Sequence, residues 1–189
     1  MNERKDMKNT TRNLALAAVS LAAALFAITA QAADEDLQSA AEQAKSNFIN
    51  ADPSMKSLMD QAAAYAVFPN VSKGGLVVGG ARGKGILFQH GQPIGQTTMT
   101  QASIGAQAGG QSFAEIIFFQ NPEPVDHFKS GGFQMRADVS AVVATQGAAR
   151  AAAYKDGMAV FSLPKKGLMV QASVGGQKFK FEPLTPTGR

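Results

Sequence analysis

Three cationic side chains, those of Lys73, Arg82 and Lys84, lie near one another in the sequence with no acidic residue between them. A lysine or arginine held near an anionic lipid surface contributes about 1 kcal/mol of attraction. The three side chains therefore predict a site for anionic lipid headgroups. Two further lysines, in a predicted turn, would add to that site: Lys165 and Lys166.

Glycine is dense in the same segment. Within a strand, glycine costs backbone entropy and offers no side chain to pack, so its presence indicates turns, bulges or the close approach of another surface. We predict that the glycines around the cations shape the backbone of a sheet. They are Gly74, Gly75, Gly79, Gly80, Gly83 and Gly85. The alternative interpretation is that the cations are solvated charges that keep edge strands from pairing with other chains.

The glycines do not form a nucleotide-binding loop. A phosphate-binding loop needs serine or threonine after its Gly-Lys pair, but Gly85 follows Lys84, and Val78 stands where the first glycine is required. The dinucleotide-binding pattern also fails, because Gly83 and Gly85 are not followed by a third glycine at the start of a helix. Nucleotide binding through this segment is excluded.

Metal-ion and nucleophilic chemistry find little support. The chain has no cysteine, and its two histidines, His90 and His127, are far apart in the sequence and outside any metal-binding motif. No Gly-x-Ser-x-Gly nucleophile elbow occurs. We therefore predict no catalytic residue, no metal and no cofactor.

Nucleic acid is not the expected partner. Stacking of bases needs aromatic side chains beside cations on one surface. The chain has no tryptophan and two tyrosines, and Phe179 and Phe181 alternate with lysines that would point the opposite way in a strand.

The N-terminal residues have the order of a secretory signal peptide. Basic residues come first, an apolar run from Leu14 to Ile28 follows, and Ala30-Gln31-Ala32 has the form of a cleavage site. We predict cleavage after Ala32, export to the periplasm, and one mature domain, 33–189. The run is short for a transmembrane helix, and an uncleaved anchor is the alternative.

Residues 33–68 are predicted to be a helical, weakly acidic leader. Apolar residues from Leu37 to Ile49 follow a helical period, Asp52-Pro53 ends this helix and caps another, and a second stripe reaches Ala66 before Pro69 stops it. Packing of these helices on a sheet is favoured over insertion into a membrane interface, because their polar faces are poor in lysine and arginine.

Residues 69–183 are predicted to be mainly sheet. Gln101 to Ala108 alternates, with Ala102 on the buried face and Gln101 on the wet face, and Ser112 to Phe119 reads as a central strand. Two strands are predicted at 158–163 and 167–174, joined by a turn at Pro164-Lys165-Lys166, and another at 177–181.

Residues 122–129 are predicted to form a short helix capped by Asn121, and residues 137–153 suit either helix or strand, with strand preferred. The predicted fold is α+β: N-terminal helices packed on a glycine-rich, strongly twisted antiparallel sheet that could curl into a barrel.

Several ordered blocks of the sequence resemble one family. The segment A-V-F-P-N-V-S-K-G-G-L-V-V-G-G-A-R-G-K-G, from Ala66 to Gly85, resembles the opening signature of the SYLF-domain family. Further similar blocks follow at 103–112, 128–133, 137–140 and 161–172. The resemblance implies a lipid-binding domain, with phosphoinositide association in eukaryotic members and actin binding in some fungal ones. Bacterial members are commonly exported.

Some family ligands do not transfer to this chain. A periplasmic protein meets neither phosphoinositides nor eukaryotic actin, and the basic helix of eukaryotic members has no counterpart because residues 34–64 are net acidic. We therefore expect a non-catalytic, periplasmic protein that associates peripherally with anionic phospholipid. The alternative is a structural or protein-interaction module of the envelope, with an unknown protein partner and no lipid ligand.

Overall fold

The computed structural model describes residues 34–75, 78–104, 111–136, 139–151, 153–166, 172–173 and 176–184. The chain divides into two compact units, Met1–Asp36 and Leu37–Arg189, and the sheet belongs to the second. The predicted signal peptide, 1–32, lies outside the described residues. Within the described part of the chain, no helix has both the length and the apolar character required to span a membrane.

Residues 34–51 form a single helix, as the apolar stripe predicts. Its apolar face is buried: Ala41, Ala44 and Phe48 are 0–3% exposed. The helix therefore has a partner surface along the side that faces away from water.

Asp52 joins this helix to the next one. Its carboxylate accepts hydrogen bonds from the Ser54 N–H (3.0 Å) and Oγ (2.7 Å) and from the Ala149 N–H (2.8 Å). Burial alone would raise the pKa of Asp52, but these hydrogen bonds outweigh it and lower the pKa to about 2. The next helix, α2, spans Met55–Gln61 and begins after Ser54 rather than at Pro53.

The second helix is shorter than the sequence predicts. It ends at Gln61, and strand β1 (Ala64–Gly75) begins before the expected stop at Pro69. From Ala64 to Phe68 every side chain is buried, since successive residues face two different cores. A strand with both faces covered has no polar alternation, so its sequence can be mistaken for the apolar stripe of a helix.

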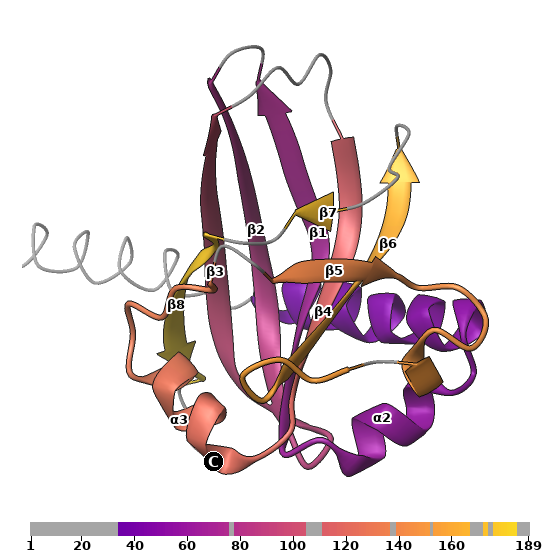
Figure 1. Ribbon diagram of the computed structural model, residues 1–189. Coiled ribbons are helices and arrows are strands. Elements are labelled where there is room, and N and C mark those ends of the chain that lie inside the picture. Colours follow the sequence, from indigo (N-terminus) through magenta and orange to yellow (C-terminus); the bar gives the residue numbers. More distant parts are fainter. Residues whose placement is uncertain are drawn as a thin grey trace, which may run out of the picture. The chain divides into compact units, whose positions relative to one another are not determined.

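Within the described residues, one sheet contains the strands, in the order β7-β5-β6-β4-β1-β2-β3-β8 (Figure 1). Neighbouring strands are antiparallel except for the parallel pair β5 and β6. The strands after β1 are β2 (Val78–Gln89), β3 (Gln92–Ile104), β4 (Gln111–Phe119), β5 (Ser140–Val143), β6 (Met158–Lys166), β7 (Ala172–Ser173) and β8 (Lys178–Pro183). The predicted α+β class is consistent with this arrangement.

The sheet does not close into a barrel, the form that the sequence analysis left open. Strands β7 and β8 are the two ends of the sheet and do not pair with each other. The outer edge of β8 is instead bonded to a connecting segment, through Phe179 N–H to Phe133 O (2.9 Å) and a bridge between Gln134 and Lys178.

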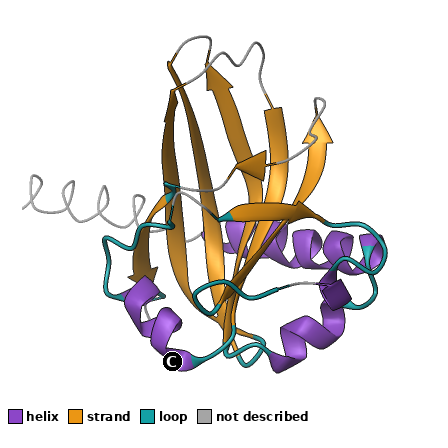
Figure 2. Ribbon diagram, in the orientation of Figure 1, coloured by secondary structure: helices purple, strands orange, loops and turns teal. Residues whose placement is uncertain are grey.

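Each face of the sheet carries its own apolar core. On one face, here called the α3 face, residues of helix α3 (Pro122–Lys129) join Phe68, Phe113 and Phe179. On the other, here called the N-helix face, residues of helix 34–51 and α2 join Tyr65, Ile86 and Phe118. Figures 1 and 2 show the long helix behind the strands, with α3 and β5 in front.

A bulge in β1 changes which residues face each core. On β2, Ile86 and Lys84 are two residues apart, but their partners on β1, Val67 and Asn70, are three apart. The register with β4 shifts at the same place. One extra residue in β1 therefore reverses its alternation, because side chains along a strand point to opposite faces in turn.

Two other sequence predictions about the sheet are wrong. Strand β6 continues through Pro164 to Lys166 instead of turning there, and β7 pairs with β5 rather than β6. On β3, Gln101 is buried and Ala102 is exposed, the reverse of the prediction, because Gln101 pairs with Ala81 on the α3 face. The part of this predicted strand at 105–108 lies outside the described residues.

Other elements agree with their predictions. Helix α3 spans Pro122–Lys129 with Asn121 at its cap and Val125 and Phe128 buried. The ambiguous region contains the short strand β5 and a single 3-10 turn, Ala149–Ala151. The central position predicted for 112–119 is confirmed by β4, which lies between β1 and β6.

Candidate functional site

Four cations share the exposed part of the N-helix face. Cross-strand partners point to the same side of a sheet, and two rows run across β2, β3 and β8. Arg82 pairs with Thr100, which pairs with Lys178. Lys84 pairs with Thr98, which pairs with Lys180. These four side chains are exposed and are called the cationic patch: Arg82, Lys84, Lys178 and Lys180.

One carboxylate lies within the cationic patch. Glu182 on β8 accepts a 2.6 Å ion-pair contact from Lys180 Nζ, with both side chains well exposed. The hydrogen bond and charge of Lys180 lower the pKa of Glu182, and the charge of Lys84 acts in the same direction from β2. The patch therefore retains a positive excess, although Lys180 is partly compensated.

Lys73 is not part of the cationic patch, which corrects the sequence prediction. It pairs with Ala81 on β2, so its side chain lies on the α3 face, and it is only 8% exposed. The cause is the bulge in β1: without the extra residue, Lys73 would share a face with Tyr65 and Val67. A buried lysine cannot contact a membrane surface.

Lys73 instead contributes to a buried polar cluster on the α3 face. Glu115 on β4 is fully buried and pairs directly with the equally buried Ser162 on β6. The side chain of Gln177, the residue before β8, donates a 3.0 Å hydrogen bond from Nε2 to Glu115 Oε2. These residues are called the polar cluster: Lys73, Glu115, Ser162 and Gln177.

Burial dominates the ionisation of the polar cluster. It raises the pKa of Glu115 to about 7, although the Gln177 hydrogen bond and the charge of Lys73 act in the opposite direction. Among the described residues, three polar atoms of the cluster have no hydrogen-bond partner. They are Glu115 Oε1, Ser162 Oγ and Gln177 Oε1.

The two predicted lysines on β6 lie apart from the patch. The strands β4 and β1 separate β6 from β2. Lys165 is exposed, and Lys166 occupies the register position opposite Ser112. Of the five cations that the sequence predicts to converge, the structure brings Arg82 and Lys84 together on one exposed face.

The predicted glycines have different roles. A Cβ atom on Gly85 would lie 2.5 Å from Val67 O and 2.7 Å from the Phe68 ring, so no side chain fits beside the bulge. Gly83 and Gly80 are also close to neighbours, at 3.0 Å from Val71 Cγ2 and 3.2 Å from Gln101 O. A Cβ on Gly74 would meet nothing within 4 Å. Gly75 and Gly79 pair with each other where β1 ends and β2 begins.

Sequence reasoning missed half of the cationic patch. The alternation of Lys178 and Lys180 with Phe179 and Phe181 correctly indicates that the lysines and phenylalanines face opposite ways. It does not indicate that β8 lies two strands from β2, which is what brings the lysines to Arg82 and Lys84. Glu115, an isolated acid in the apolar strand 112–119, was the available signal for the polar cluster.

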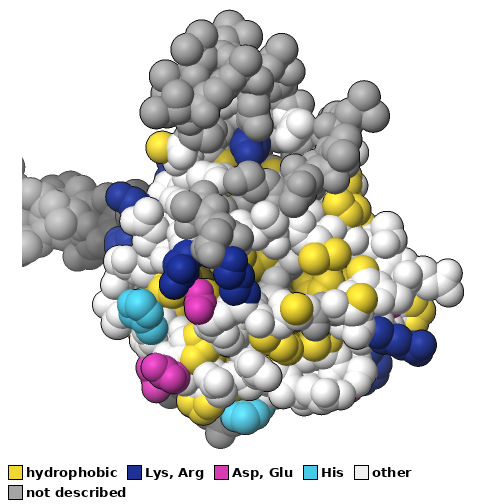
Figure 3. All heavy atoms as spheres, viewed as in Figure 1, with side chains coloured by type: hydrophobic (Ala, Val, Ile, Leu, Met, Phe, Trp, Pro, Cys, Tyr) yellow, Lys and Arg dark blue, Asp and Glu magenta, His cyan; other side chains and the backbone are white. Residues whose placement is uncertain are grey.

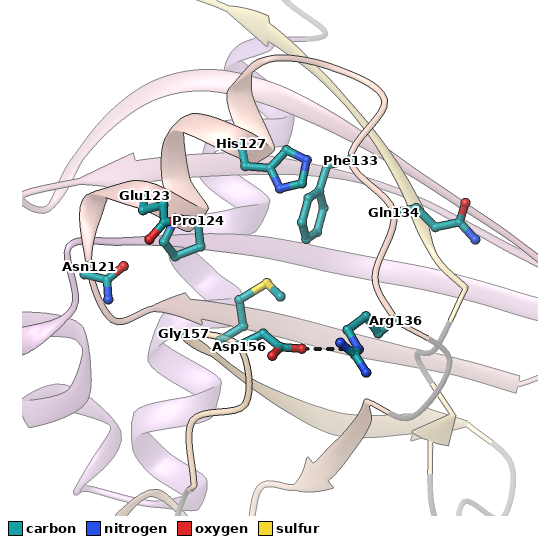
Figure 4. Close-up of a pocket in the computed structure, with 10 residues that line it drawn as sticks. Asn121, Glu123, Pro124, His127, Phe133, Gln134, Arg136, Asp156 and Gly157 are labelled. Atoms are coloured by element: carbon teal, nitrogen blue, oxygen red, sulfur yellow. Dashed lines mark ion pairs between the residues drawn. The ribbon is translucent and has the colours of Figure 1, made fainter.

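A hollow of about 470 Å³ lies beside α3 (Figure 4). On one side of the hollow, the ring centroids of His127 and Phe133 are 5.1 Å apart and the ring planes are 88° apart. On the other side, Arg136 Nε lies 3.4 Å from Asp156 Oδ2. Within the described residues, no group of three or more histidine, aspartate or glutamate side chains could hold a metal ion.

Hydrophobic side chains gather on the surface over β5 (Figure 3). Val142, at 47% exposure, is the large apolar residue exposed there, and it lines a shallow hollow with Val139 and Ala153. This surface lies away from the cationic patch, which belongs to strands at the other end of the sheet.

Comparison with known proteins shows what this chain is similar to. Residues 100–183 match the family model described as "Ysc84: Las17-binding protein actin regulator". This range covers the C-terminal part of β3 and everything from β4 to β8. This match confirms the resemblance to the SYLF (Ysc84) family over these residues.

The chain is also similar to a named protein. The chain is 30% identical over 165 residues to "Beta cell expansion factor A" of Aeromonas veronii. The alignment covers 85% of this chain and 62% of that protein, so the chain spans less than two thirds of the length of this relative. The family match contains Lys178, Lys180, Glu115 and Gln177, whereas Arg82 and Lys84 precede it.

Proposed function

We propose that this chain is a non-catalytic, exported lipid-binding protein of the bacterial envelope that associates peripherally with anionic phospholipid. The single observation that carries the proposal is the cationic patch, in which four cations from β2 and β8 share one exposed face. Each lysine or arginine near an anionic lipid surface contributes about 1 kcal/mol to the free energy of binding. Similarity of residues 100–183 to the SYLF family supports a binding module, and the signal-like residues 1–32 support export.

The surroundings of the patch favour a surface ligand over a pocket ligand. On β3, Thr98 lies between Lys84 and Lys180, and Thr100 lies between Arg82 and Lys178. Both threonines therefore have their hydroxyl groups on the same face of the sheet as the cations. A lipid headgroup presents phosphate oxygens that accept hydrogen bonds from such groups and pair with arginine. Because the patch is exposed, its attraction is screened by salt, and binding is expected to be reversible.

The test is co-sedimentation of the purified protein with vesicles. Wild type should pellet with vesicles of one part phosphatidylglycerol to three parts phosphatidylcholine, pellet poorly with pure phosphatidylcholine, and dissociate as sodium chloride rises. Replacing Arg82, Lys84, Lys178 and Lys180 together by Gln should raise the dissociation constant for these vesicles by about 10³-fold, since four contributions of about 1 kcal/mol are lost.

A matched control keeps the net charge equal. A second variant replaces four other cations by Gln: Lys56, Lys129, Arg150 and Lys155. If both variants lose affinity equally, net charge rather than the patch controls binding. If neither lipid charge nor the patch matters, the proposal fails. The alternative, a protein-interaction module, then becomes the better explanation, because the family description names a protein-binding protein.

A further inference from the structure

The unpartnered atoms of the polar cluster are complementary to one another. Gln177 Nε2 already donates to Glu115 Oε2, which leaves the second oxygen of each side chain without a partner. Both of these oxygens are acceptors when Glu115 is ionised, so neither satisfies the other. A single proton on Glu115 Oε1 provides the missing donor, because a neutral carboxylic acid and an amide can exchange two hydrogen bonds side by side.

We propose that Glu115 carries a proton and forms a two-bond acid–amide pair with Gln177, and that this pair is a proton-dependent tie on the edge strand β8. The tie regulates the cationic patch, so its role in lipid binding rests on the function proposed above. The existence of the tie does not.

The surroundings of Glu115 favour the neutral form. The carboxyl group is fully buried, and the transfer of an ionised carboxylate out of water is costly unless it is paired and hydrogen-bonded. Among the described residues, the charge that acts on it is that of Lys73, from β1. Ser162 faces it from β6 and Gln177 from the position just before β8, and neither carries a charge. Burial outweighs Lys73 and raises the pKa of Glu115 to about 7.

The tie holds the segment that presents half of the cationic patch. Gln177 immediately precedes Lys178, and its carbonyl accepts a 2.8 Å hydrogen bond from the Met135 N–H. Its side chain turns to the α3 face to reach Glu115 on β4, whereas Lys178 and Lys180 point to the opposite face. Strand β8 pairs with β3 on one side and is bonded to the connecting segment on the other, and neither of these contacts reaches β4. The Gln177–Glu115 contact therefore links this edge of the sheet to a central strand that β8 does not pair with.

The direction of the pH dependence follows from linkage. The folded tie binds a proton with a pKa of about 7, whereas an opened carboxyl has an ordinary pKa of 4.5. Between these values the closed state holds the proton and the opened state does not, so raising the pH favours opening. The tie is therefore strongest below about pH 5 and is lost as the pH rises through 7.

The experiment measures hydrogen–deuterium exchange of the Phe179 amide in the full chain without lipid, corrected for intrinsic exchange. We expect protection to fall by close to tenfold per pH unit between about pH 5 and pH 6.5 and to level off above pH 8. In Glu115→Gln, which cannot ionise, protection should not depend on pH. Glu123→Gln, an exposed acid on α3, should keep the wild-type profile.

A second measurement decides the proposal even if Glu115→Gln does not fold. In wild type, the ¹³C resonance of the Glu115 carboxyl carbon should be that of a neutral acid at pH 6 and should titrate near neutrality. An ionised carboxyl at pH 6, or an unchanged pH profile in Glu115→Gln, overturns the tie. If protection of the Phe179 amide depends on pH as expected but the patch variant binds vesicles as well as wild type does, the acid–amide pair is supported and the lipid-binding function is rejected. If the patch variant loses affinity for vesicles but protection of the Phe179 amide is independent of pH, only the acid–amide pair is rejected.

Discussion

The cations of β1 and β2 are neighbours in the sheet, yet they have opposite environments. Lys84 is exposed on the N-helix face, beside a threonine and across from Lys180. Lys73 is 8% exposed on the α3 face, where it acts on a fully buried carboxyl group. The difference is not one of residue type or local composition. It arises from one extra residue in β1, which reverses the facing of everything that follows.

This comparison shows how a bulge can divide one cationic segment between two tasks. The outward cations are available to a ligand and carry little cost in stability. The inward lysine sits among groups whose burial is costly, so it belongs to the energetics of folding. Three predictions, in order of expected effect, test this division.

The largest effect concerns the inward region. Because burial raises the folded pKa of Glu115 from 4.5 to about 7, the folded state binds a proton that the unfolded state has released. The free energy of unfolding should therefore fall by up to about 3 kcal/mol from pH 5 to pH 8. Urea denaturation across this range measures it. Glu115→Gln should remove this part of the slope, and Glu123→Gln should not; equal slopes in all three proteins would contradict the assignment.

The second effect concerns the bulge that separates the two regions. Gly85→Ala should destabilise the protein by about 2 kcal/mol or more, because its Cβ would press on the Val67 carbonyl and the Phe68 ring. Gly74→Ala is the matched control: a Cβ there meets nothing within 4 Å, and the expected change in unfolding free energy is within about 0.5 kcal/mol. Denaturant midpoints provide the measurement, and similar losses in both variants would show that the bulge is not the constraint.

The smallest effect comes from exchanging two neighbouring residues of β1, which changes the face of one cation and leaves the amino-acid composition unchanged. Ser72 is exposed and pairs with Arg82, one position before the inward Lys73. Exchanging the two residues, as Ser72→Lys with Lys73→Ser, moves one cation from the α3 face to the cationic patch. Affinity for phosphatidylglycerol vesicles should rise by about fivefold, the equivalent of about 1 kcal/mol. The single variant Lys73→Met should bind vesicles with an affinity within about twofold of wild type. A larger loss of affinity would show that Lys73 contributes to headgroup binding.

Local patterns in the sequence were enough to predict several elements. Helix 34–51 and α3 follow from their apolar periods and capping residues, and β8 follows from its alternation. The part that could not be predicted depends on pairing between distant strands. No local signal reveals that β8 lies beside β3, and Lys178 and Lys180 were missed for that reason.

Register explains the remaining errors. The facing of Lys73 depends on a bulge that only the partner strands make visible, since the pairing with β2 and β4 defines the extra residue. The facing of Gln101 depends likewise on its neighbour Ala81. At 164–166, proline favoured a turn in the sequence, but a strand can accept proline where no ladder hydrogen bond from its nitrogen is needed.

The path of β6 through that proline bears on self-association. Strand β5 pairs with β6 at Phe161 and Ser162, so the stretch from Leu163 onward has no β5 residue on its second side. An open strand edge is a template on which another molecule can add a strand, and such growth leads to aggregates. Pro164 lacks the donor that an added strand would need, and the exposed Lys165 would bring charge against charge in any pairing of like copies. If the chain gathers on an anionic membrane as proposed, Pro164 and Lys165 would oppose the addition of a strand from a second copy at this edge.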